Sequence, residues 1–201
     1  MIATAPRPSL SFPPEILWRL TVTQYHQMIA AGIFTDDDRV ELLDGVLTLK
    51  MPKKPAHRIA TKLLRKALEA LMPEGWYVDT QEPITLDTSE PEPDVVVVRG
   101  DTRDYRDRHP GPRELGLVVE VADATLERDR TLKQRLYAQS GIACYWVVNL
   151  PERQLEVYTQ PKRGEFDTGY QQVTILTAED SIQCTIEGTA WGNIPIQDIL
   201  P

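Results

Sequence analysis

The sequence lacks long apolar runs, and it contains few cysteines. No segment approaches the ~20 consecutive apolar residues that a membrane-spanning helix needs, so we expect no association with a membrane. The two cysteines, Cys144 and Cys184, lie in separate apolar runs, which excludes a disulfide-rich scaffold and a zinc site built from Cys-x-x-Cys pairs. The first residues contain Arg7 but no apolar run behind it, so they do not resemble a secretory signal. We expect a cytoplasmic protein.

The sequence also lacks an excess of positive charge. Its 201 residues are 41% apolar and 26% charged, a composition typical of a folded globular domain, and the formal net charge is −8. Because proteins that bind nucleic acid without a specific site are usually basic, a polyanion would have to meet a local basic surface. The interval between Asp44 and Glu69 has no acidic residue, and is either a solvated helix face or a surface for phosphate groups. Its basic residues are Lys50, Lys53, Lys54, Arg58, Lys62, Arg65 and Lys66.

The beginning of the chain is rich in proline and small residues. We expect residues 1–13 to form a loose lead-in and residues 14–201 to form a single domain, since no internal repeat divides them. The spacing of Thr21 and Gln24 fits a capping box, and it predicts a short helix after Thr21.

Two further elements are predicted before the middle of the chain. VELLDGVLTLKM, at residues 40–51, is predicted to be a β-hairpin because Asp44-Gly45 favours a tight type I′ turn. From His57 to about Met72, apolar residues recur at helical spacing on one side and basic residues occupy another, which predicts an amphipathic helix.

Short apolar runs dominate the rest of the sequence. The runs at 95–98 and 117–121 are rich in β-branched residues, which is typical of strands in the middle of a sheet. Residues 126–140, followed by Gly141, have the pattern of a helix, so 117–150 is predicted to be a β-α-β crossover. The fold class is therefore α/β, of a mixed α+β kind, with a central mixed β-sheet flanked by helices. The predicted strands are 76–79, 83–87, 94–99, 117–122, 144–150, 154–159, 170–176 and 181–186.

Two acidic residues lie where a charged side chain is costly. Asp94 comes just before one apolar run, and Glu120 lies within another, on the same strand face as Val118 and Ala122. A buried carboxylate costs several kcal/mol unless it is paired or binds a metal. We expect Asp94 to face solvent at an edge of the sheet, whereas Glu120 needs a partner.

Lys133 is the candidate partner, because it lies on the predicted crossover helix. Asp129 and Tyr137 are spaced four residues to either side of it, so all three share one helix face. Two interpretations stay open: an exposed ion pair between Asp129 and Lys133, or a lysine delivered to the end of the sheet beside the strand carboxylates.

The order of several short segments is informative. ELLDG occurs at 41–45, His57 opens a helix, PDVVVV occurs at 93–98, VEVADAT at 119–125 and DRTLKQRLYAQSGIACYWVV at 129–148. In this order they resemble the Uma2 family, also called DUF820, which is abundant in cyanobacteria. That family is described as restriction-endonuclease-like, within the PD-(D/E)XK nuclease superfamily. The resemblance covers roughly residues 15–195, and it implies a restriction-endonuclease-like core.

The resemblance implies a metal-dependent endonuclease that hydrolyses phosphodiester bonds in DNA. Asp94, Glu120 and the backbone carbonyl of Val121 would hold Mg²⁺ or Mn²⁺, since hard oxygen ligands favour these ions. Glu41 resembles the additional acid that some members of the superfamily bring to the metal.

The sequence departs from the superfamily at its lysine. That lysine normally follows two residues after the second acid, where this chain has Ala122. Lys133, on the following helix, is the matching candidate for the lysine that orients or activates the attacking water. The resemblance also implies a homodimer or higher homo-oligomer. The predicted DNA-binding residues are Lys54, Arg58, Lys62 and Arg65, and the possible accessory residues are His57, Asp129 and Tyr137.

Two other functions stay open. The first is a non-catalytic nucleic-acid-binding or regulatory module, in which Asp94, Glu120 and Lys133 form a structural ion network. The second is a metal-dependent hydrolase of another phosphoester, such as a nucleotide. Metal binding without cleavage would favour the module, and salt-sensitive binding of DNA would disfavour the nucleotide hydrolase.

Overall fold

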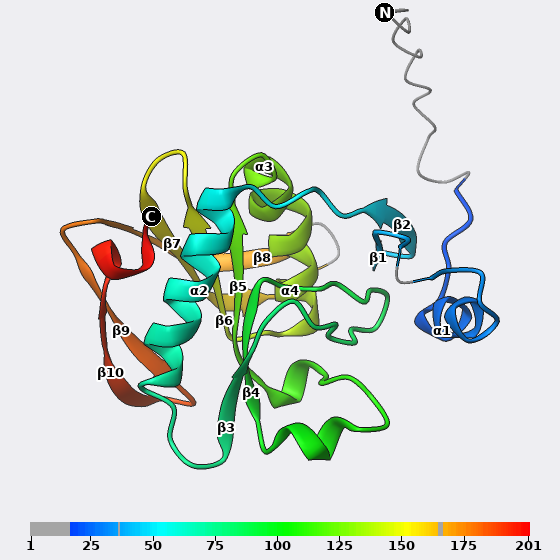
Figure 1. Ribbon diagram of the computed structural model, residues 1–201, viewed down its shortest axis with the longest axis horizontal. Helices are drawn as coiled ribbons and strands as arrows, with labels where there is room; N and C mark the ends of the chain where they lie inside the picture. Colours follow the sequence, from blue (N-terminus) through cyan, green and yellow to red (C-terminus); the bar gives the residue numbers. More distant parts are fainter. Residues whose placement is uncertain (1–16, 36, 165–166) are drawn as a thin grey trace, which may run out of the picture.

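A six-stranded mixed β-sheet forms the centre of the protein (Figure 1). The computed structural model describes residues 17–35, 37–164 and 167–201, so the lead-in expected at residues 1–13 lies outside the described residues. The strands of the sheet, in spatial order, are β3 (Trp76–Asp79), β4 (Val95–Arg99), β5 (Leu115–Ala122), β6 (Cys144–Asn149), β7 (Gln154–Lys162) and β8 (Gly169–Thr177). The apolar strands β4 and β5 therefore lie inside the sheet, as predicted.

The predicted β-α-β crossover is confirmed. Strands β5 and β6 are the parallel pair of the sheet, with Glu120 opposite Val147, and the other neighbours are antiparallel. The connection consists of α3 (Leu126–Arg128), a π-helical turn η4 (Asp129–Lys133) and α4 (Gln134–Ser140). Gly141 ends it with a left-handed backbone (φ 77°), which glycine adopts without strain.

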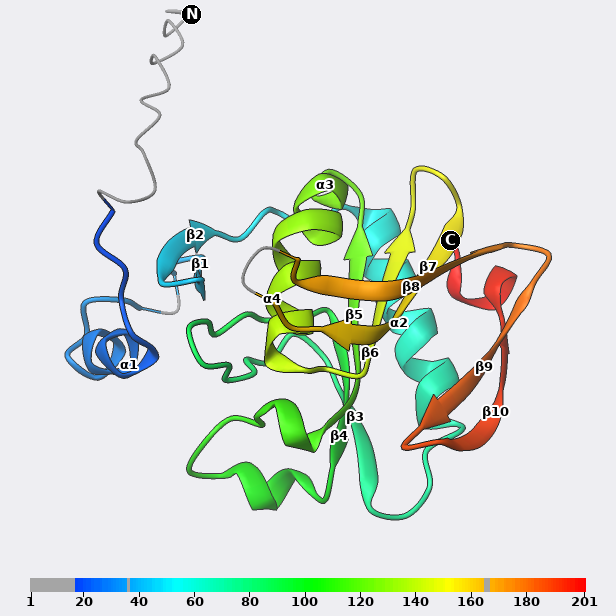
Figure 2. The same cartoon turned by 180° about the vertical axis from the view of Figure 1, so that it is seen from behind.

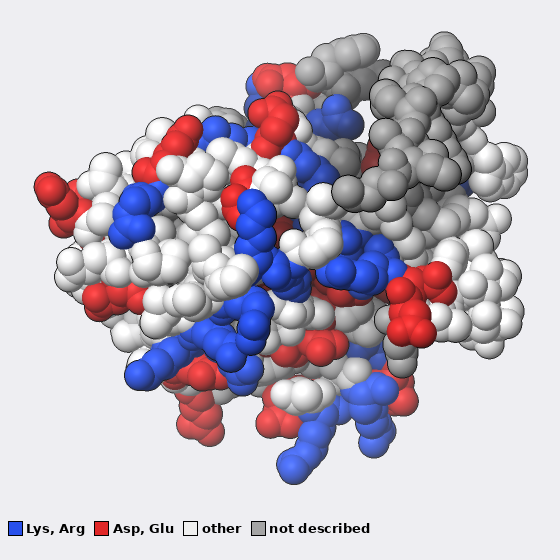
Figure 3. Space-filling view, turned by 45° about the horizontal axis from the view of Figure 1, so that its top comes forward, with Lys and Arg blue, Asp and Glu red and all other residues white. Residues whose placement is uncertain are grey.

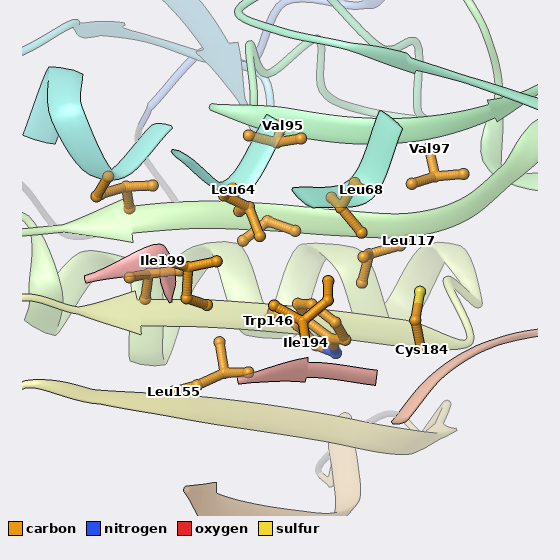
Figure 4. Close-up of a cluster of buried hydrophobic side chains, with 14 of the residues drawn as sticks. Leu64, Leu68, Val95, Val97, Leu117, Trp146, Leu155, Cys184, Ile194 and Ile199 are labelled. Atoms are coloured by element: carbon orange, nitrogen blue, oxygen red, sulfur yellow. The ribbon is translucent and has the colours of Figure 1, made fainter. Parts of the chain in front are cut away.

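Each face of the sheet has its own hydrophobic core. Helix α2 (Pro55–Glu69) lies on one face, where Leu64 and Leu68 pack against Val95 and Leu117 (Figure 4). A hairpin of β9 (Ser181–Ile186) and β10 (Thr189–Pro195), followed by the short helix η5 (Ile196–Ile199), closes the same core. The turn η4 and α4 cover the opposite face, seen from behind in Figure 2, where tyrosine side chains dominate the packing.

The N-terminal elements form a small separate layer beside the sheet. Helix α1 (Val22–Ala30) begins with the predicted capping box, in which Thr21 and Gln24 bond each other's backbone N–H. The predicted hairpin is β1 (Val40–Leu43) with β2 (Val46–Leu49). Asp44 (φ 49°) and Gly45 (φ 74°) both adopt the positive φ of a type I′ turn.

The predicted strand at 83–87 is wrong. Ile84 and Leu86 are buried, but their backbone N–H groups donate to Pro91 and Ser89 within the same loop, so the segment does not join a sheet. Strand β10 was not predicted, because Gly192 and Pro195 weaken its strand pattern and a register shift interrupts its pairing with β9. In the described ranges, every helix is too short or too polar to span a lipid bilayer.

Candidate active site

A polar pocket lies where β4 begins and β5 ends. The antiparallel register of these strands pairs Val95 with Val119, so Asp94 comes beside Glu120 one residue further on. The hairpin β1–β2, the first turn of α2 and the turn η4 complete the walls. The pocket therefore brings together the predicted residues Glu41, Lys54, His57, Asp94, Glu120 and Lys133, with Lys50, Lys53, Glu92, Asp123, Thr125 and Arg128 around them.

Asp94 is buried, so the prediction that it faces solvent is wrong. The residue is 6% exposed, and its Oδ2 accepts a hydrogen bond from the backbone N–H of Val121 (2.9 Å). His57 Nε2 lies 3.0 Å from the same oxygen, and Lys53 Nζ lies 3.7 Å from Oδ1. Asp94, one residue before the start of β4, thus directs its carboxylate onto β5 instead of outward.

Lys133 contacts Glu120. This is the arrangement expected under the second interpretation, in which the crossover helix brings the lysine to the end of the sheet beside the strand carboxylates. Its Nζ donates to Glu120 Oε1 (2.8 Å) and lies 3.6 Å from Glu41 Oε2, and the lysine is 3% exposed. Tyr137 also donates its hydroxyl to Glu120 Oε1 (2.7 Å). The π-helical turn ends at Lys133, and such turns are often found at functional sites because they redirect side chains.

The exposed pair of Asp129 with Lys133 is not formed. Asp129 is 1% exposed, and its Oδ2 accepts from the hydroxyl of Thr125 (2.6 Å). Its Oδ1 is buried and has no hydrogen-bond partner among the described residues. Asp129 and Tyr137 lie behind the pocket wall, so they surround Lys133 without lining the opening.

The two strand carboxylates differ in their electrostatics. Burial, with help from Asp129 and Asp94, raises the pKa of Glu120 to about 8 against the opposing effect of Lys133. Burial acts the same way on Asp94, but His57, the N–H of Val121 and Lys53 outweigh it and hold the pKa of Asp94 below its ordinary value. The environment of Asp94 therefore favours its ionised form, whereas burial favours the protonated form of Glu120, and a further cation in the pocket would lower the pKa of Glu120.

Lys133 remains charged in spite of its burial. Burial alone would lower the pKa of Lys133, but the nearby carboxylates of Glu120, Glu41 and Asp129 raise it above its ordinary value. A permanent ammonium group inside a pocket is a fixed positive charge, which suits an anionic substrate.

The donor atoms of the pocket fit Mg²⁺ or Mn²⁺. Asp94 and Glu120 supply hard carboxylate oxygens, and no cysteine lines the pocket. Asp94 Oδ1 has only the distant Lys53 ammonium beside it, and Glu120 Oε2 accepts no hydrogen bond among the described residues. Among the described residues, no group of three His, Cys, Asp or Glu side chains is already arranged to hold a metal ion. Two carboxylates with water or phosphate oxygens suffice for Mg²⁺.

Val121 and Glu41 were predicted to help hold the metal. The structure shows the backbone N–H of Val121 engaged with Asp94, while its carbonyl is not part of the pocket lining. Glu41 is buried beside Lys133 Nζ (3.6 Å) and Arg128 Nη1 (3.7 Å), and its Oε2 accepts from the backbone N–H of Glu92 (3.3 Å). The metal-binding roles of Val121 and Glu41 therefore stay predictions.

The four predicted DNA-binding residues do not all lie in the pocket. Lys54 lines it and pairs with Asp123 (2.9 Å), whereas the other three line a neighbouring hollow along α2. Lys53 borders both hollows and so connects them. Figure 3 shows this side of the molecule, where basic side chains run across the middle with acidic side chains between them. The three residues of the second hollow are Arg58, Lys62 and Arg65.

Sequence analysis did not identify Lys53 and Arg128 as site residues. Lys53 lies in a PKKP segment before the first turn of α2, where only the fold brings it to Asp94. Arg128 is one of several charged residues in LERDRTLK, and its buried Nε has no hydrogen-bond acceptor among the described residues. The available signal was the general basic character of residues 50–66, which does not distinguish one lysine from another.

Comparison with known proteins identifies both a family and a similar fold. A family model named Uma2, described as "putative restriction endonuclease", matches residues 22–195. A solved structure of a "putative nuclease belonging to DUF820" from Anabaena variabilis is similar to the chain, with 11% sequence identity and a TM-score of 0.65. The similarity covers 90% of this chain and 97% of that chain, and at this identity it establishes the fold alone. The predicted nuclease-like fold is therefore confirmed. No curated protein matches the sequence.

Proposed function

Because the chain belongs to the Uma2 family, we propose that it is a metal-dependent endonuclease that hydrolyses phosphodiester bonds in DNA. The observation that carries the proposal is the pocket at the ends of β4 and β5. Asp94 and Glu120 lie there side by side, almost fully buried, with Lys133 donating to Glu120 over 2.8 Å. Such a cluster of buried charged side chains is costly to stability, which favours a catalytic use.

Asp94 and Glu120 would hold Mg²⁺ or Mn²⁺ through their oxygens that face the pocket. The bound ion would supply Lewis-acid activation of a phosphate oxygen and lower the pKa of a water. His57 and the N–H of Val121 keep Asp94 ionised and fix its orientation. Glu120 would hold the ion in its deprotonated form, because a nearby positive charge lowers the pKa of a carboxyl group.

Lys133 would take the place of the lysine that usually follows the second acid in this superfamily. Its ammonium, already charged and held by Glu120 and Glu41, stabilises negative charge that develops on the phosphate. Since these contacts exist before substrate binds, little reorganisation is needed. Tyr137 positions the Glu120 carboxylate from behind.

Basic residues along α2 would hold the DNA backbone. Lys53 lies in the pocket wall, and Arg58 and Lys62 continue from it along the exposed side of the helix. These contacts are independent of base sequence and weaken as salt increases. The net charge of −8 makes this local surface the expected region for DNA.

Nicking of supercoiled plasmid in Mn²⁺ tests the proposal. We expect the wild-type protein to nick the plasmid, EDTA to stop it and Glu120→Gln to lose the activity. Glu90→Gln is the matched control, because Glu90 is equally buried but pairs with His26 outside the pocket. Absence of nicking in the wild type, with Mn²⁺ bound, would instead support a non-catalytic module. Equal nicking by Glu120→Gln would show that the activity comes from a contaminant.

A further inference from the structure

The two edges of the central sheet differ in their protection. Strand β3, at one edge, is four residues long, and Trp76 at its start is covered by Arg99 and Trp191. Strand β8, at the other edge, has nine residues, and its outer side pairs with no strand among the described residues. Short length is one of the usual means of preventing edge-to-edge pairing. Strand β3 is short, whereas β8 is long.

The residues of β8 also lack the charges that normally protect an edge. The sequence GYQQVTILT contains no Lys, Arg, Asp, Glu or Pro. The five residues 171–175 are exposed on both faces of the sheet, and Figure 2 shows β8 on the near side of the molecule. Val173 and Ile175 are 50% and 57% exposed. They extend the tyrosine-rich core face, because they lie opposite Tyr158 and Glu156 of β7.

A second copy of the chain fits this edge better than a charged partner does. In a symmetric pair each residue of β8 meets β8 residues of the other copy, and an uncharged strand brings no like charges together. An antiparallel arrangement centred on Thr174 places Val173 opposite Ile175 of the other copy, and Ile175 opposite its Val173. Both apolar residues lie on one face, so the four side chains would form one cluster across the junction.

We propose that β8 pairs antiparallel with β8 of a second copy, joining two sheets into one twelve-stranded sheet. This inference assigns a surface to the expected homo-oligomer, and it does not depend on nuclease activity. Strand β8 lies three strands away from β5, so the pockets of both copies stay open in the dimer. The unpaired backbone groups of the two edges bond each other, and the exposed apolar strip becomes covered.

Light scattering with size-exclusion chromatography tests the pairing. We expect the wild type at micromolar concentration to have twice the monomer mass of 22.8 kDa. Val173→Lys with Ile175→Lys places like charges opposite each other, and we expect the monomer mass. The control is Ile29→Lys with Ile33→Lys, which adds the same charge at exposed apolar residues outside β8 and should stay dimeric. A monomeric wild type, or a dimeric β8 variant, would overturn the proposal.

A fluorescence measurement tests the register independently of the lysine variants. Thr174→Cys labelled with pyrene places the two labels about 5 Å apart at Cβ if the pair is centred on this residue, so excimer emission is expected. Glu179→Cys, exposed and outside β8, is the control that should give monomer emission. Dimers of labelled Thr174→Cys without excimer emission would contradict the arrangement. Both native cysteines are largely buried, and circular dichroism should show unchanged folding of every variant.

Discussion

Glu120 and Glu156 occupy the same row of the sheet but have opposite electrostatic states. Val147 on β6 lies between them, paired with Glu120 of β5 on one side and Glu156 of β7 on the other. Both glutamates are almost fully buried on the face covered by η4 and α4. Each meets a basic residue of the same turn, since Arg130 bonds Glu156 and Lys133 bonds Glu120.

The difference lies in how completely each carboxylate is bonded. Glu156 accepts from Arg130 through both oxygens, from Asn149 (2.8 Å) and from the hydroxyl of Tyr158 (2.8 Å). Burial opposes ionisation, but these donors outweigh it and lower the pKa of Glu156. Glu120 has one oxygen without a donor and a raised pKa. A buried carboxylate with complete hydrogen bonding serves stability, whereas one left incomplete beside a pocket is available for binding.

The largest expected effect is on stability, and it concerns Arg130. Arg130→Met leaves Glu156 buried and ionised without its partner, which should cost about 3 kcal/mol of unfolding free energy. Urea unfolding measures it, with exposed Arg103→Met as a control that should change little. Nicking per folded molecule should be retained within a few-fold. A loss of stability no larger than that of the control would mean that Glu156 is not a structural anchor.

Lys133→Met should have the opposite pattern to Arg130→Met, with a large loss of activity and a smaller loss of stability. We expect nicking to fall about 100-fold, the usual effect of removing one group that stabilises a charged transition state. The loss of stability should be smaller than for Arg130→Met, because burial raises the pKa of Glu120, so its carboxyl group is neutral and is not left as an unpaired buried charge. Single-turnover rates with saturating Mn²⁺ separate the effect on chemistry from binding. Full activity of Lys133→Met would remove this residue from the proposed mechanism.

Binding of Mn²⁺ should depend on pH through Glu120. The folded-state pKa of about 8 is above the ordinary value of 4.5, so the proton is bound at neutral pH and must leave before the ion binds. Affinity should therefore rise with pH, by at most about tenfold per unit, and level off above about pH 8. Calorimetry measures both the affinity and the released proton. Glu120→Gln should remove the pH dependence, and an unchanged dependence would assign the proton to another group.

The smallest effect is expected from the basic residues of α2. A plot of the logarithm of DNA affinity against the logarithm of salt concentration gives a slope that reports the number of phosphate contacts. Lys62→Glu with Arg65→Glu should make this slope less steep by about 2, with the fold intact. Fluorescence anisotropy over a salt series measures the slope. Arg103→Glu with Arg106→Glu, exposed on a different loop, is the control for net charge. Equal slopes for the two double variants would place DNA elsewhere on the surface.

The elements predicted correctly are those whose local residue pattern matches the place that they occupy in the fold. β4 and β5 were recognised because continuous β-branched runs are favourable only inside a sheet. The helix after Thr21 was recognised from a capping box that forms within three residues. The segment 83–87 misled the prediction, because buried Ile84 and Leu86 alternate as in a strand although their backbone bonds stay within a loop.

The candidate site was only partly predictable for a similar reason. Glu120 stood out because a charge inside an apolar strand requires a partner, and its partner Lys133 was found on the crossover helix. The π-helical turn that aims Lys133 has no pattern of its own in the sequence. The burial of Asp94 depends on a bond to Val121, which is distant in the chain, and local periodicity does not report such contacts.

The closing of the α2 core by residues 194–200 has a consequence for the order of folding. Ile194, Ile196, Ile199 and Leu200 complete the core that α2 and the early strands begin, although they come from the opposite half of the chain. During synthesis, α2 can form early, but its apolar side lacks its final cover until these residues emerge. Contacts between such distant segments slow folding, so docking of residues 194–200 is expected to be a late step, after the crossover around η4 has formed from local contacts.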